Sequence, residues 1–405
     1  MAERPLRLLV AGCSWPLETF LERLFEGLAG KGVEITIALP VAPDPTWLRT
    51  NGVRWLRSPA WNDPIPLRLL RLTEMALEAT IGGRRDLRLL RPHVAALPRG
   101  VPRLRVWNQL LPYVGRRADV IYFPWNSAAI SHSALFDLGV PVLLSCRGSQ
   151  VNIGPLDPDR QDLRDGLGAT FSRAAAVHCV SKAIEAEAET YGLDPARSKV
   201  IYPAVDPERF HPPARVRYEK EPQRVVAVGS LSWKKGFDYA LRAVRLASDA
   251  GFDLELEIIG DGADRQRLLF GIQDLGLSGR VCLSGQLPPE EIAERLQSAD
   301  LFLLSSVSEG VSNAALEAMA TGLPVVTTDC GGMREIISDG VEGFVVPVRD
   351  AERMATALGR LAENADLRAR MGAAGRRRVF KEFTLERQVR AFTELLDEVR
   401  KCGHA

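Results

Sequence analysis

Cysteine is scarce and scattered in this chain of 405 residues. There are six cysteines, and no two of them form a Cys-x-x-Cys pair or share the spacing of metal ligands. Small secreted domains need closely spaced disulfides, and structural zinc sites need paired ligands, so the sequence argues against both. Scattered thiols of this kind are typical of a protein in a reducing compartment.

Long apolar runs are also missing. No window of eighteen residues is free of polar residues, so the sequence predicts no transmembrane helix. The first residues, MAERPLRLLVAG, hold no apolar stretch long enough for a signal peptide. Solenoid repeats and low-complexity tracts are absent as well. We therefore expect a globular protein of the cytoplasm, with no nucleic-acid partner.

The net charge is only +1, but it is unevenly distributed. Residues 66–117 contain eleven arginines against three acidic residues, and leucines are interleaved with the arginines. Part of this segment can form a basic amphipathic helix, which would suit an anionic membrane surface or an anionic acceptor. A solvated helical face explains the same composition equally well. The sequence thus allows a peripheral position on the inner face of a membrane without requiring it.

Short apolar runs alternate with helical patterns along most of the chain. The run LRLLVAG at residues 6–12 is followed by apolar residues at helical spacing from Leu17, and then by an alternating stretch at 33–39. Strand, helix and strand in that order predict a βαβ unit with parallel pairing. Further strands are expected at 118–123, 141–146, 174–181, 199–204, 224–230, 254–260, 280–285, 300–306, 323–329 and 343–348.

A proline-rich, charged stretch at residues 207–223 separates two such series and predicts a linker. We therefore expect two doubly wound α/β domains, over residues 1–206 and 224–384, followed by an amphipathic helix at 385–405. Ligands of such sheets bind at the carboxyl ends of the strands, and a cleft between two domains is the usual place for a site.

The stretch SEGVSNAALEAMA at residues 308–320 places a loop directly before a helix. Ser312 and Asn313 are good N-cap residues, and the unpaired N–H groups at such a helix start favour a phosphate group. Glu317, one turn inside, is suited to accept hydrogen bonds from a pair of hydroxyls, as on a ribose. Glu309 would face whatever is attached beyond the phosphates. The spacing fits a nucleotide sugar, although two exposed glutamates around a helix start are also common.

Residues 308–347 resemble the donor-site signature of the family 4 retaining glycosyltransferases, which have the GT-B fold. The matching features are two glutamates separated by seven residues, then GLPVV, GG-x-x-E and DG-x-x-GF. Residues 180–212 and 228–241 also resemble the family, and WPLETF at 15–20 resembles the subgroup that builds exopolysaccharides and lipopolysaccharides. The resemblance covers nearly the whole chain and is weakest at 60–117. It implies two Rossmann-like domains facing a central cleft, with the C-terminal helix crossing back onto the acceptor-binding N-terminal domain.

The resemblance also implies roles for single residues. Glu317 would hold the donor ribose, Glu309 would contact the donor sugar near the reacting carbon, and Lys235 would neutralise the leaving diphosphate. Positive charge placed there lowers the barrier to bond cleavage, and the family needs no metal or other cofactor for it. The other expected donor-binding residues are Gly12, Ser230, Gln286, Leu287, Gly310, Val311, Ser312 and Asn313. Glu18 and Arg147 are expected on the acceptor side, and Arg147 is the third expected catalytic residue.

Two positions depart from the family pattern. Ser230 stands where an arginine usually contacts the diphosphate, and Arg147 stands where a histidine is common. Because Arg147 is permanently cationic, it cannot be a general base, and we expect it to bind an anionic acceptor or the donor phosphate. A surface-loop arginine is the simpler alternative. Lys235 as a turn lysine and Glu18 as an acid at a helix start are further simple alternatives.

We expect a retaining glycosyltransferase that moves a sugar from a nucleotide-diphosphate sugar to a hydroxyl of a glycan or lipid-linked acceptor. The leaving phosphate itself would take the acceptor proton, as the resemblance implies. Ser230 motivates one alternative, a non-catalytic sugar-nucleotide-binding subunit of a glycan assembly complex. A nucleotide-sugar epimerase of similar architecture is the other. The string Asp157-Pro158-Asp159 is expected to match a metal motif by chance, and His178 is expected to lie in the core.

Overall fold

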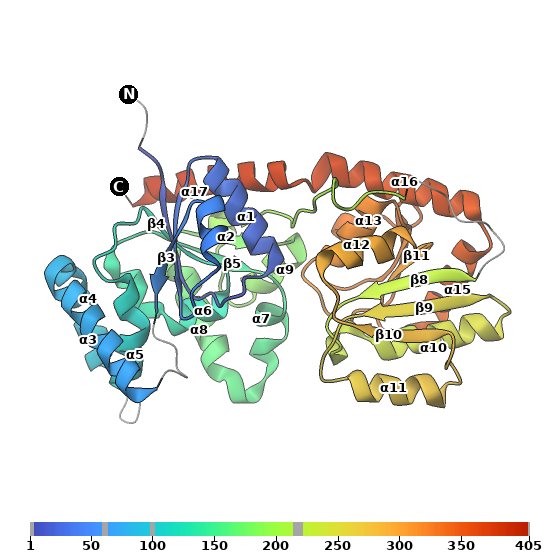
Figure 1. Ribbon diagram of the computed structural model, residues 1–405, viewed down its shortest axis with the longest axis horizontal. Coiled ribbons are helices and arrows are strands. Elements are labelled where there is room, and N and C mark those ends of the chain that lie inside the picture. Colours follow the sequence, from blue (N-terminus) through green and yellow to red (C-terminus); the bar gives the residue numbers. More distant parts are fainter. Residues whose placement is uncertain (1–3, 59–63, 98–101, 214–221, 404–405) are drawn as a thin grey trace. The chain divides into compact units, whose positions relative to one another are not determined.

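The computed structural model of the chain describes residues 4–58, 64–97, 102–213 and 222–403 (Figure 1). It divides into two compact units, each built on one parallel sheet. Unit 1 comprises Met1–Val180, Glu185–Ile201 and Gln388–Ala405, and unit 2 comprises Ser181–Ile184 and Tyr202–Arg387.

The chain enters unit 2 slightly before the boundary expected from the sequence. Residues 202–206, expected in the first domain, cluster with unit 2, where the Val205 N–H donates to the Phe383 carbonyl at 3.0 Å. The first part of the expected linker also packs there, because Phe210 is buried in the unit 2 core. The remainder of that linker, residues 214–221, lies outside the described residues.

The sheet of unit 1 has seven parallel strands in the order β3-β2-β1-β4-β5-β6-β7. Its central strands are continuous apolar runs, as expected for parallel strands that are covered on both faces. The apolar patterns predict every strand except β3, whose burial is confined to Val53. The strands are Arg7–Val10 (β1), Glu34–Leu39 (β2), Val53–Arg57 (β3), Val120–Phe123 (β4), Val142–Cys146 (β5), Ala176–Cys179 (β6) and Ser198–Val200 (β7).

The arginine-rich segment of unit 1 forms three helices, α3 (Ile65–Gly82), α4 (Arg84–Ala95) and α5 (Arg103–Leu110), which contact one another in sequence (Figure 1). Its residues 98–101 lie outside the described part of the chain. Among the described helices, none has both the length and the apolar character needed to cross a bilayer. The other helices that begin before β8 are α1 (Thr19–Gly30), α2 (Pro45–Thr50), η1 (Leu111–Tyr113), α6 (Asn126–Ser131), η2 (Ser133–Leu138), α7 (Ser149–Asn152), η3 (Gly154–Leu156), η4 (Pro158–Arg160), α8 (Gln161–Arg173), α9 (Lys182–Glu189) and η5 (Pro195–Arg197).

The sheet of unit 2 has six parallel strands in the order β10-β9-β8-β11-β12-β13, and each was predicted. One apolar core packs it against α10, α11 and α15, and a second core packs it against α12, α13 and α16. The strands are Gln223–Val228 (β8), Leu254–Ile259 (β9), Val281–Gly285 (β10), Leu301–Leu304 (β11), Val325–Thr328 (β12) and Gly343–Val346 (β13). The helices are η6 (Trp233–Lys235), α10 (Phe237–Asp249), α11 (Arg265–Asp274), α12 (Pro289–Gln297), α13 (Asn313–Thr321), α14 (Met333–Ile336), α15 (Ala351–Ala362) and α16 (Ala365–Glu382).

Helix α17 (Leu385–Cys402) returns the chain to unit 1, which confirms the predicted C-terminal helix crossing. The apolar face of α17 packs against unit 1, which explains why the chain returns there. Val389 fills the space left by Gly27, where a Cβ atom would lie 2.3 Å from its Cγ2. The Phe392 ring lies 4.6 Å from the His178 ring and 6.2 Å from the Tyr122 ring, between centroids. Unit 1 is therefore completed by residues that follow the whole of unit 2.

Candidate functional site

Both sheets reverse their strand order at one point, and the loops that follow the strands on either side of it are where ligands of such sheets bind. In unit 2 this point lies between β8 and β11, which are hydrogen-bonded neighbours. The two loops that leave it are residues 229–236 and 305–312. They contain most of the residues that the sequence predicts for the donor site.

Helix α13 begins as predicted from its N-cap. The Ser312 hydroxyl accepts the Ala315 N–H at 3.3 Å, and Gly322 ends the helix with φ +85°. The start of the helix therefore carries N–H groups and the positive end of a dipole. Glu317 lies one turn inside, partly buried. The loop that enters the helix is suited to an anion, and residues 310–313 form it.

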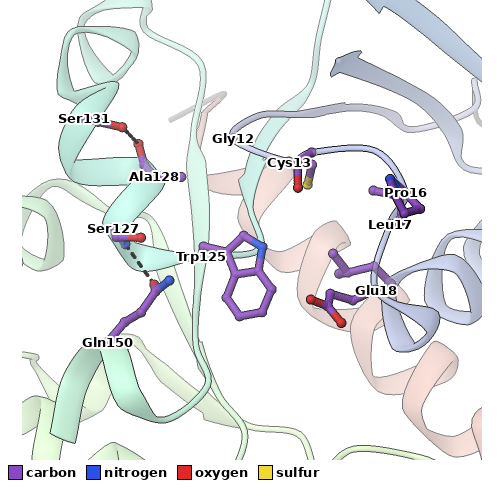
Figure 2. Close-up of a pocket in the computed structure, with 12 residues that line it drawn as sticks. Gly12, Cys13, Pro16, Leu17, Glu18, Trp125, Ser127, Ala128, Ser131 and Gln150 are labelled. Atoms are coloured by element: carbon purple, nitrogen blue, oxygen red, sulfur yellow. Dashed lines mark hydrogen bonds between the residues drawn. The ribbon is translucent and has the colours of Figure 1, made fainter. Parts of the chain in front are cut away.

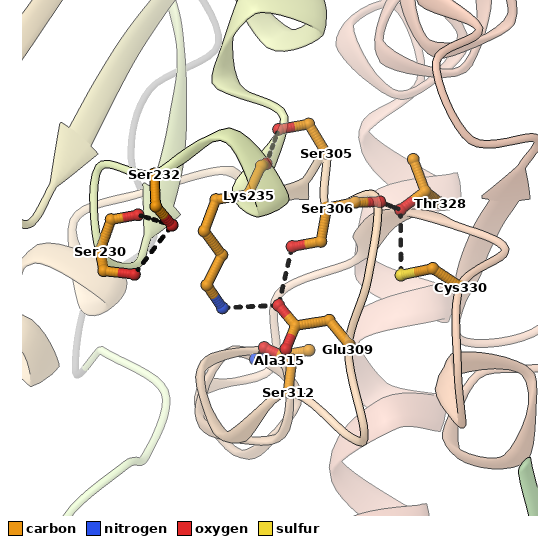
Figure 3. A network of polar contacts seen from close by, with 10 residues as sticks. All are labelled: Ser230, Ser232, Lys235, Ser305, Ser306, Glu309, Ser312, Ala315, Thr328 and Cys330. Atoms are coloured by element: carbon orange, nitrogen blue, oxygen red, sulfur yellow. Dashed lines mark hydrogen bonds and ion pairs between the residues drawn. The ribbon is translucent and has the colours of Figure 1, made fainter. Parts of the chain in front are cut away.

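Lys235 and Glu309 form an ion pair in front of this helix start (Figure 3). The Lys235 Nζ lies 2.5 Å from Glu309 Oε1, and the Ser306 hydroxyl donates to the same oxygen at 2.7 Å. The two charged side chains are only 17% and 13% exposed, respectively. A pair this far out of water attracts through a lower dielectric than a surface ion pair, and removing one partner leaves a poorly solvated, uncompensated charge. The sequence predicts both residues for the donor site but not their contact.

Backbone contacts hold the lysine turn against the end of β11. The Val307 N–H donates to the Lys234 carbonyl at 2.7 Å, and the Ser305 hydroxyl donates to the Lys235 carbonyl at 2.9 Å. Gly236 follows with φ +62°, and a Cβ atom there would lie 2.2 Å from the Ser305 carbonyl oxygen. Only glycine fits this close approach, so the turn fixes the position of the Lys235 backbone relative to the end of β11.

The segment Cys330-Gly331-Gly332 packs beneath the Glu309 loop. A Cβ atom at Gly331 would lie 1.9 Å from the Glu309 carbonyl oxygen, and the Gly332 N–H donates to the Gly310 carbonyl at 2.7 Å. Burial raises the pKa of the Cys330 thiol to about 12, which keeps it protonated. These glycines are therefore needed for close packing of the loop.

Glu335, three residues after the glycine pair, also has a structural role. Its carboxylate accepts the N–H groups of Lys182 and Ala183 at 2.8 and 2.9 Å, and the Tyr202 hydroxyl at 2.8 Å. Two of these donors belong to the first turn of α9, whose unpaired N–H groups a carboxylate stabilises. The sequence motif GG-x-x-E thus supports the site without lining it.

Three further residues predicted for donor binding lie together in unit 2. Ser230, Gln286 and Leu287 line one pocket of about 310 Å³ at the carboxyl ends of β8, β9 and β10. The exposed Ser230 hydroxyl lies 3.3 Å from that of Ser232 (Figure 3). The other residues that line the pocket are Val228, Gly229, Ile259, Gly260, Asp261 and Ile292.

The corresponding point of unit 1 lies between β1 and β4 and holds a pocket of about 420 Å³ (Figure 2). Gly12 and Glu18 line it, as expected for residues that follow β1. Trp125 and Gln150 line it too, and neither was predicted. A signal was present, because Trp125 directly follows the β4 pattern at the carboxyl end of the neighbouring strand. The other residues that line the pocket are Cys13, Ser14, Pro16, Leu17, Leu21, Ser127, Ala128 and Ser131.

The walls of this pocket are fixed by short contacts. Gly12 has φ +77°, and a Cβ atom there would lie 2.2 Å from the Ala128 Cβ, so packing within unit 1 alone requires a glycine. The Gln150 side chain accepts the Ser127 N–H at 3.2 Å. Burial raises the pKa of the Cys13 thiol to about 12, so no thiolate lines the pocket at neutral pH. The pocket combines one aromatic face with hydroxyl, amide and carboxylate groups.

Arg147, expected on the acceptor side, lies beside this pocket but does not line it. Its Nε donates to the Pro124 carbonyl at 3.1 Å, and its guanidinium carbon lies 4.3 Å from the centroid of the Phe20 ring and 5.9 Å from that of Trp125. The guanidinium therefore stacks on Phe20, whose ring in turn contacts that of Trp125. The sequence did not predict this position.

Two minor predictions can also be placed. His178 is fully buried in β6, which confirms its expected place in the core. In the Asp157-Pro158-Asp159 string, the Asp157 carboxylate accepts the Asp159 N–H at 3.0 Å and caps a short 3-10 helix. Within the described residues, no group of three or more His, Cys, Asp or Glu side chains is arranged to hold a metal ion.

Two family models match the chain, one in each half. Residues 17–209 match "Glycosyltransferase Family 4", and residues 212–378 match "Glycosyl transferases group 1". The amylovoran biosynthesis glycosyltransferase AmsK of Erwinia amylovora is 34% identical over 51% of this chain and 52% of its own length. The putative colanic acid biosynthesis glycosyltransferase WcaL of Escherichia coli is 29% identical over 60% of this chain and 61% of its own length. The matches span between half and two thirds of these curated relatives.

Solved structures agree with the fold over nearly the whole chain. HepE of Anabaena, in complex with UDP, has a TM-score of 0.71 at 17% identity and covers 97% of this chain and 99% of its own. Sucrose-phosphate synthase of Thermosynechococcus elongatus has a TM-score of 0.76 at 19% identity and covers 98% of this chain and 100% of its own. At these identities the likeness establishes the architecture of two parallel-sheet units and nothing finer.

Proposed function

The chain belongs to the family 4, group 1 glycosyltransferases of the GT-B fold, and from this we propose that it transfers a sugar from a nucleotide-diphosphate sugar to a hydroxyl of a glycan or lipid-linked saccharide. The Lys235–Glu309 ion pair before the start of α13 is the observation that carries this proposal. The names of AmsK and WcaL, which are polysaccharide-building enzymes, support the class of acceptor.

We assign the donor to the carboxyl edge of the unit 2 sheet. The base would enter the pocket of Gln286 and Leu287, the ribose would reach Glu317, and the diphosphate would lie on residues 310–313. Lys235 has three N–H donors, so it can keep Glu309 and still donate to a phosphate oxygen. Cleavage of the sugar–phosphate bond builds negative charge at that oxygen, and a preformed cation there lowers the barrier.

Glu309 is assigned to the hydroxyls of the donor sugar. Its Oε1 already accepts from Lys235 and Ser306, so the lone pairs of that oxygen are engaged and it is a poor nucleophile. We therefore propose retention by attack on the same face as the departing phosphate, with that phosphate taking the acceptor proton. No metal or other cofactor is part of this proposal. Arg147 would act from the acceptor side as a fixed cation.

The experiment that tests this function is release of nucleoside diphosphate from a panel of UDP-, GDP- and ADP-sugars with EDTA present. Glu309→Ala and Lys235→Ala should each lower release from the preferred donor by about 10²–10³-fold. Glu363→Ala and Lys381→Ala, which remove the same charges from exposed positions of unit 2, are the matched controls. Thermal melting of each variant separates loss of chemistry from loss of the fold.

The panel also distinguishes the alternatives. Donor binding without release, even with crude glycolipid acceptor added, would favour a non-catalytic subunit, since Ser230 leaves the diphosphate with one cation fewer than the family pattern. Conversion of the donor sugar to its epimer, without transfer, would favour an epimerase. Loss of release in EDTA, restored by a divalent cation, would overturn the metal-free mechanism.

We further propose that unit 1 meets an anionic membrane surface through α3 and α4. The aliphatic side chains of Leu70, Leu77 and Ile81 on α3 are 56%, 63% and 77% exposed, which is unusual for a globular surface. Exposed arginines, among them Arg88 and Arg91, lie on the neighbouring helix α4. Aliphatic groups that enter an interface, flanked by arginines that bind anionic lipid, are the combination that peripheral helices use.

Cosedimentation with vesicles tests this surface. Vesicles with phosphatidylglycerol should bind the protein at low salt and lose it as salt rises, and phosphatidylcholine vesicles should not bind it. A Leu77→Gln, Ile81→Gln variant should bind weakly, whereas Leu269→Gln, Phe270→Gln, which removes exposed apolar groups from α11 of unit 2, should bind normally. Equal sedimentation with both kinds of vesicle would remove the electrostatic part of the proposal, and no binding to either would remove the proposal.

A further inference from the structure

A chain of hydrogen bonds runs through the interior of unit 1 across three adjacent strands. The Tyr122 hydroxyl on β4 lies 2.8 Å from the Ser145 hydroxyl on β5, which lies 2.7 Å from Nδ1 of His178 on β6. Nε2 of His178 lies 2.8 Å from the Ile201 carbonyl oxygen. At the other end, Nη2 of Arg147 donates to the Tyr122 oxygen at 3.2 Å. The three linking side chains are at most 1% exposed.

The direction of every bond in this chain follows from its two ends. The Ile201 carbonyl can only accept, so Nε2 of His178 carries the proton and Nδ1 accepts from Ser145. The Ser145 oxygen then accepts from the Tyr122 hydroxyl, whose own oxygen accepts from Arg147, a group that can only donate. Burial, together with the charge of Arg147, lowers the pKa of His178 to about 3, so the neutral imidazole that this order needs is the form present at neutral pH.

The chain ends at the wall of the unit 1 pocket. Arg147 is held between two hydrogen bonds. Its Nη2 donates to the Tyr122 hydroxyl, and its Nε donates to the Pro124 carbonyl. The next residue, Trp125, lines the pocket, and its ring meets the Phe20 ring edge to face with centroids 5.9 Å apart. Arg147 stacks on Phe20 at 4.3 Å. The position of the aromatic wall is thus linked, bond by bond, to a histidine buried two strands away.

We propose that His178 is a positioning residue, which acts through Ser145 and Tyr122 to fix Arg147 and the Pro124–Trp125 wall of the unit 1 pocket. It touches no ligand itself. The value of this positioning for catalysis rests on the proposed function, in which that pocket receives the acceptor. The positioning itself does not rest on it. A set of buried hydrogen bonds that served only stability would hold the strands together equally well without controlling the wall.

Conservative variants separate the two roles. Tyr122→Phe removes only the hydroxyl that Arg147 and Ser145 share, and Ser145→Ala interrupts the chain one step further from the pocket. Thr170→Val is the matched control, because Thr170 is a buried residue of unit 1 whose hydroxyl donates to the Gly166 carbonyl at 2.9 Å, outside the chain. Each of the three variants removes one buried hydroxyl that has two hydrogen-bond partners, since the Thr170 hydroxyl also lies 2.9 Å from the Leu167 carbonyl, and similar losses of stability are expected.

The first measurement is the indole N–H signal of Trp125 in a ¹⁵N spectrum of the full chain, assigned by its loss in Trp125→Phe. Tyr122→Phe and Ser145→Ala should shift or broaden this signal, and Thr170→Val should leave it in place. In the unaltered protein, ¹⁵N-labelled histidine should show His178 neutral with its proton on Nε2. An unmoved Trp125 signal in both chain variants, or a proton on Nδ1, would overturn the inference whatever the activity of the protein.

The second measurement is kinetic. With the acceptor that supports transfer, Tyr122→Phe and Ser145→Ala should raise the acceptor KM about tenfold, which corresponds to about 1.4 kcal/mol, while release of nucleotide without acceptor stays unchanged. The free-energy change calculated from the acceptor KM of the double variant should be smaller than the sum of the two single changes, because both substitutions break the same chain of hydrogen bonds. A moved Trp125 signal with an unchanged acceptor KM would support the positioning and count against the pocket as the acceptor site.

Discussion

Units 1 and 2 share one topology but place different chemistry where their strand order reverses. In unit 2, the loops after β8 and β11 bring together a cation and a carboxylate, Lys235 and Glu309. In unit 1, the loops after β1 and β4 form a pocket around Trp125, and the cation of Arg147 does not line it but stacks on Phe20. The first arrangement suits a reaction that builds charge, and the second suits a ring with hydroxyl groups. The shared fold fixes where a ligand binds, and the loop residues decide which ligand it is.

Removing one charged side chain from each unit in turn tests this difference most directly. Lys235→Ala should lower the release of nucleotide without acceptor by about 10²–10³-fold, because it removes a preorganised charge beside the leaving group. Glu18→Ala in unit 1 should leave that release within about twofold, a difference too small to mark a lost charge contact. The check is steady-state release of nucleoside diphosphate from the preferred donor. Equal losses of nucleotide release in the two variants would contradict the assignment of the leaving group to unit 2 alone.

The second largest expected difference between the units is their loss of stability at low pH. The pKa of His178 is lowered to about 3 and that of His132 is also lowered, both mainly by burial within unit 1. Between pH 3 and 6.5 the unfolded chain therefore binds more protons at His178, so unit 1 loses stability as the pH falls below about 6.5, and the lowered pKa of His132 acts in the same direction. The advantage of the unaltered protein over His178→Gln should shrink by about 1.4 kcal/mol per pH unit in that range.

Urea unfolding from pH 7 to 5 checks this difference, and hydrogen exchange locates it. Unit 1 amides should lose protection before unit 2 amides, since the one unit 2 histidine in the described residues, His211, is exposed. A constant gap between the two proteins across the pH range would contradict the buried neutral imidazole.

A smaller effect is expected from the aromatic wall of unit 1. Trp125→Ala should raise the acceptor KM about tenfold, because it removes the one aromatic ring among the residues that line the pocket. Trp125→Phe, which keeps an aromatic face, should recover most of that loss. Kinetics over a range of acceptor concentrations at saturating donor provide the measurement. A change in the donor KM instead would mean that Trp125 acts on the donor and not on the acceptor.

The smallest effect is expected at Ser230 in unit 2. Its side chain is exposed at the rim of the predicted base pocket, so Ser230→Arg would add a cation at the surface rather than inside a dry site. Exposed ion pairs contribute less than about 1 kcal/mol, so the donor KM should fall about threefold. Isothermal titration with nucleoside diphosphate measures the same change. Weaker binding would mean that this position accepts no arginine.

The sequence predicts most of the fold because the signal is local. Every strand except β3 lies in an apolar or alternating stretch of the sequence, and the start and end of α13 follow from Ser312 and Gly322 alone. Edge strand β3, VRWLR, has arginine at two of its five positions and therefore lacks such a stretch. The donor motif is equally local, since Glu309 and Glu317 lie on one loop and the helix that follows it.

The contacts that organise the sites are not local, and the sequence carries no direct sign of them. Lys235 and Glu309 are 74 residues apart, and only the pairing of β8 with β11 brings their loops together. Ser145 and His178 are 33 residues apart. The apolar sequence around each of these two residues indicates that it is buried, but it does not indicate which residue it bonds to. The roles of Arg147 and Trp125 depend on the same kind of distant pairing.

The return of α17 also determines the order in which the protein can mature during synthesis. A ribosome makes the sheet of unit 1 first, then all of unit 2, and only afterwards the segment that carries Val389 and Phe392. Until then the apolar surface over Gly27, Tyr122 and His178 has no cover. Unit 2 is nearly continuous in the chain and can fold while it emerges. The nascent protein therefore completes unit 2, to which we assign the donor, before unit 1 is closed.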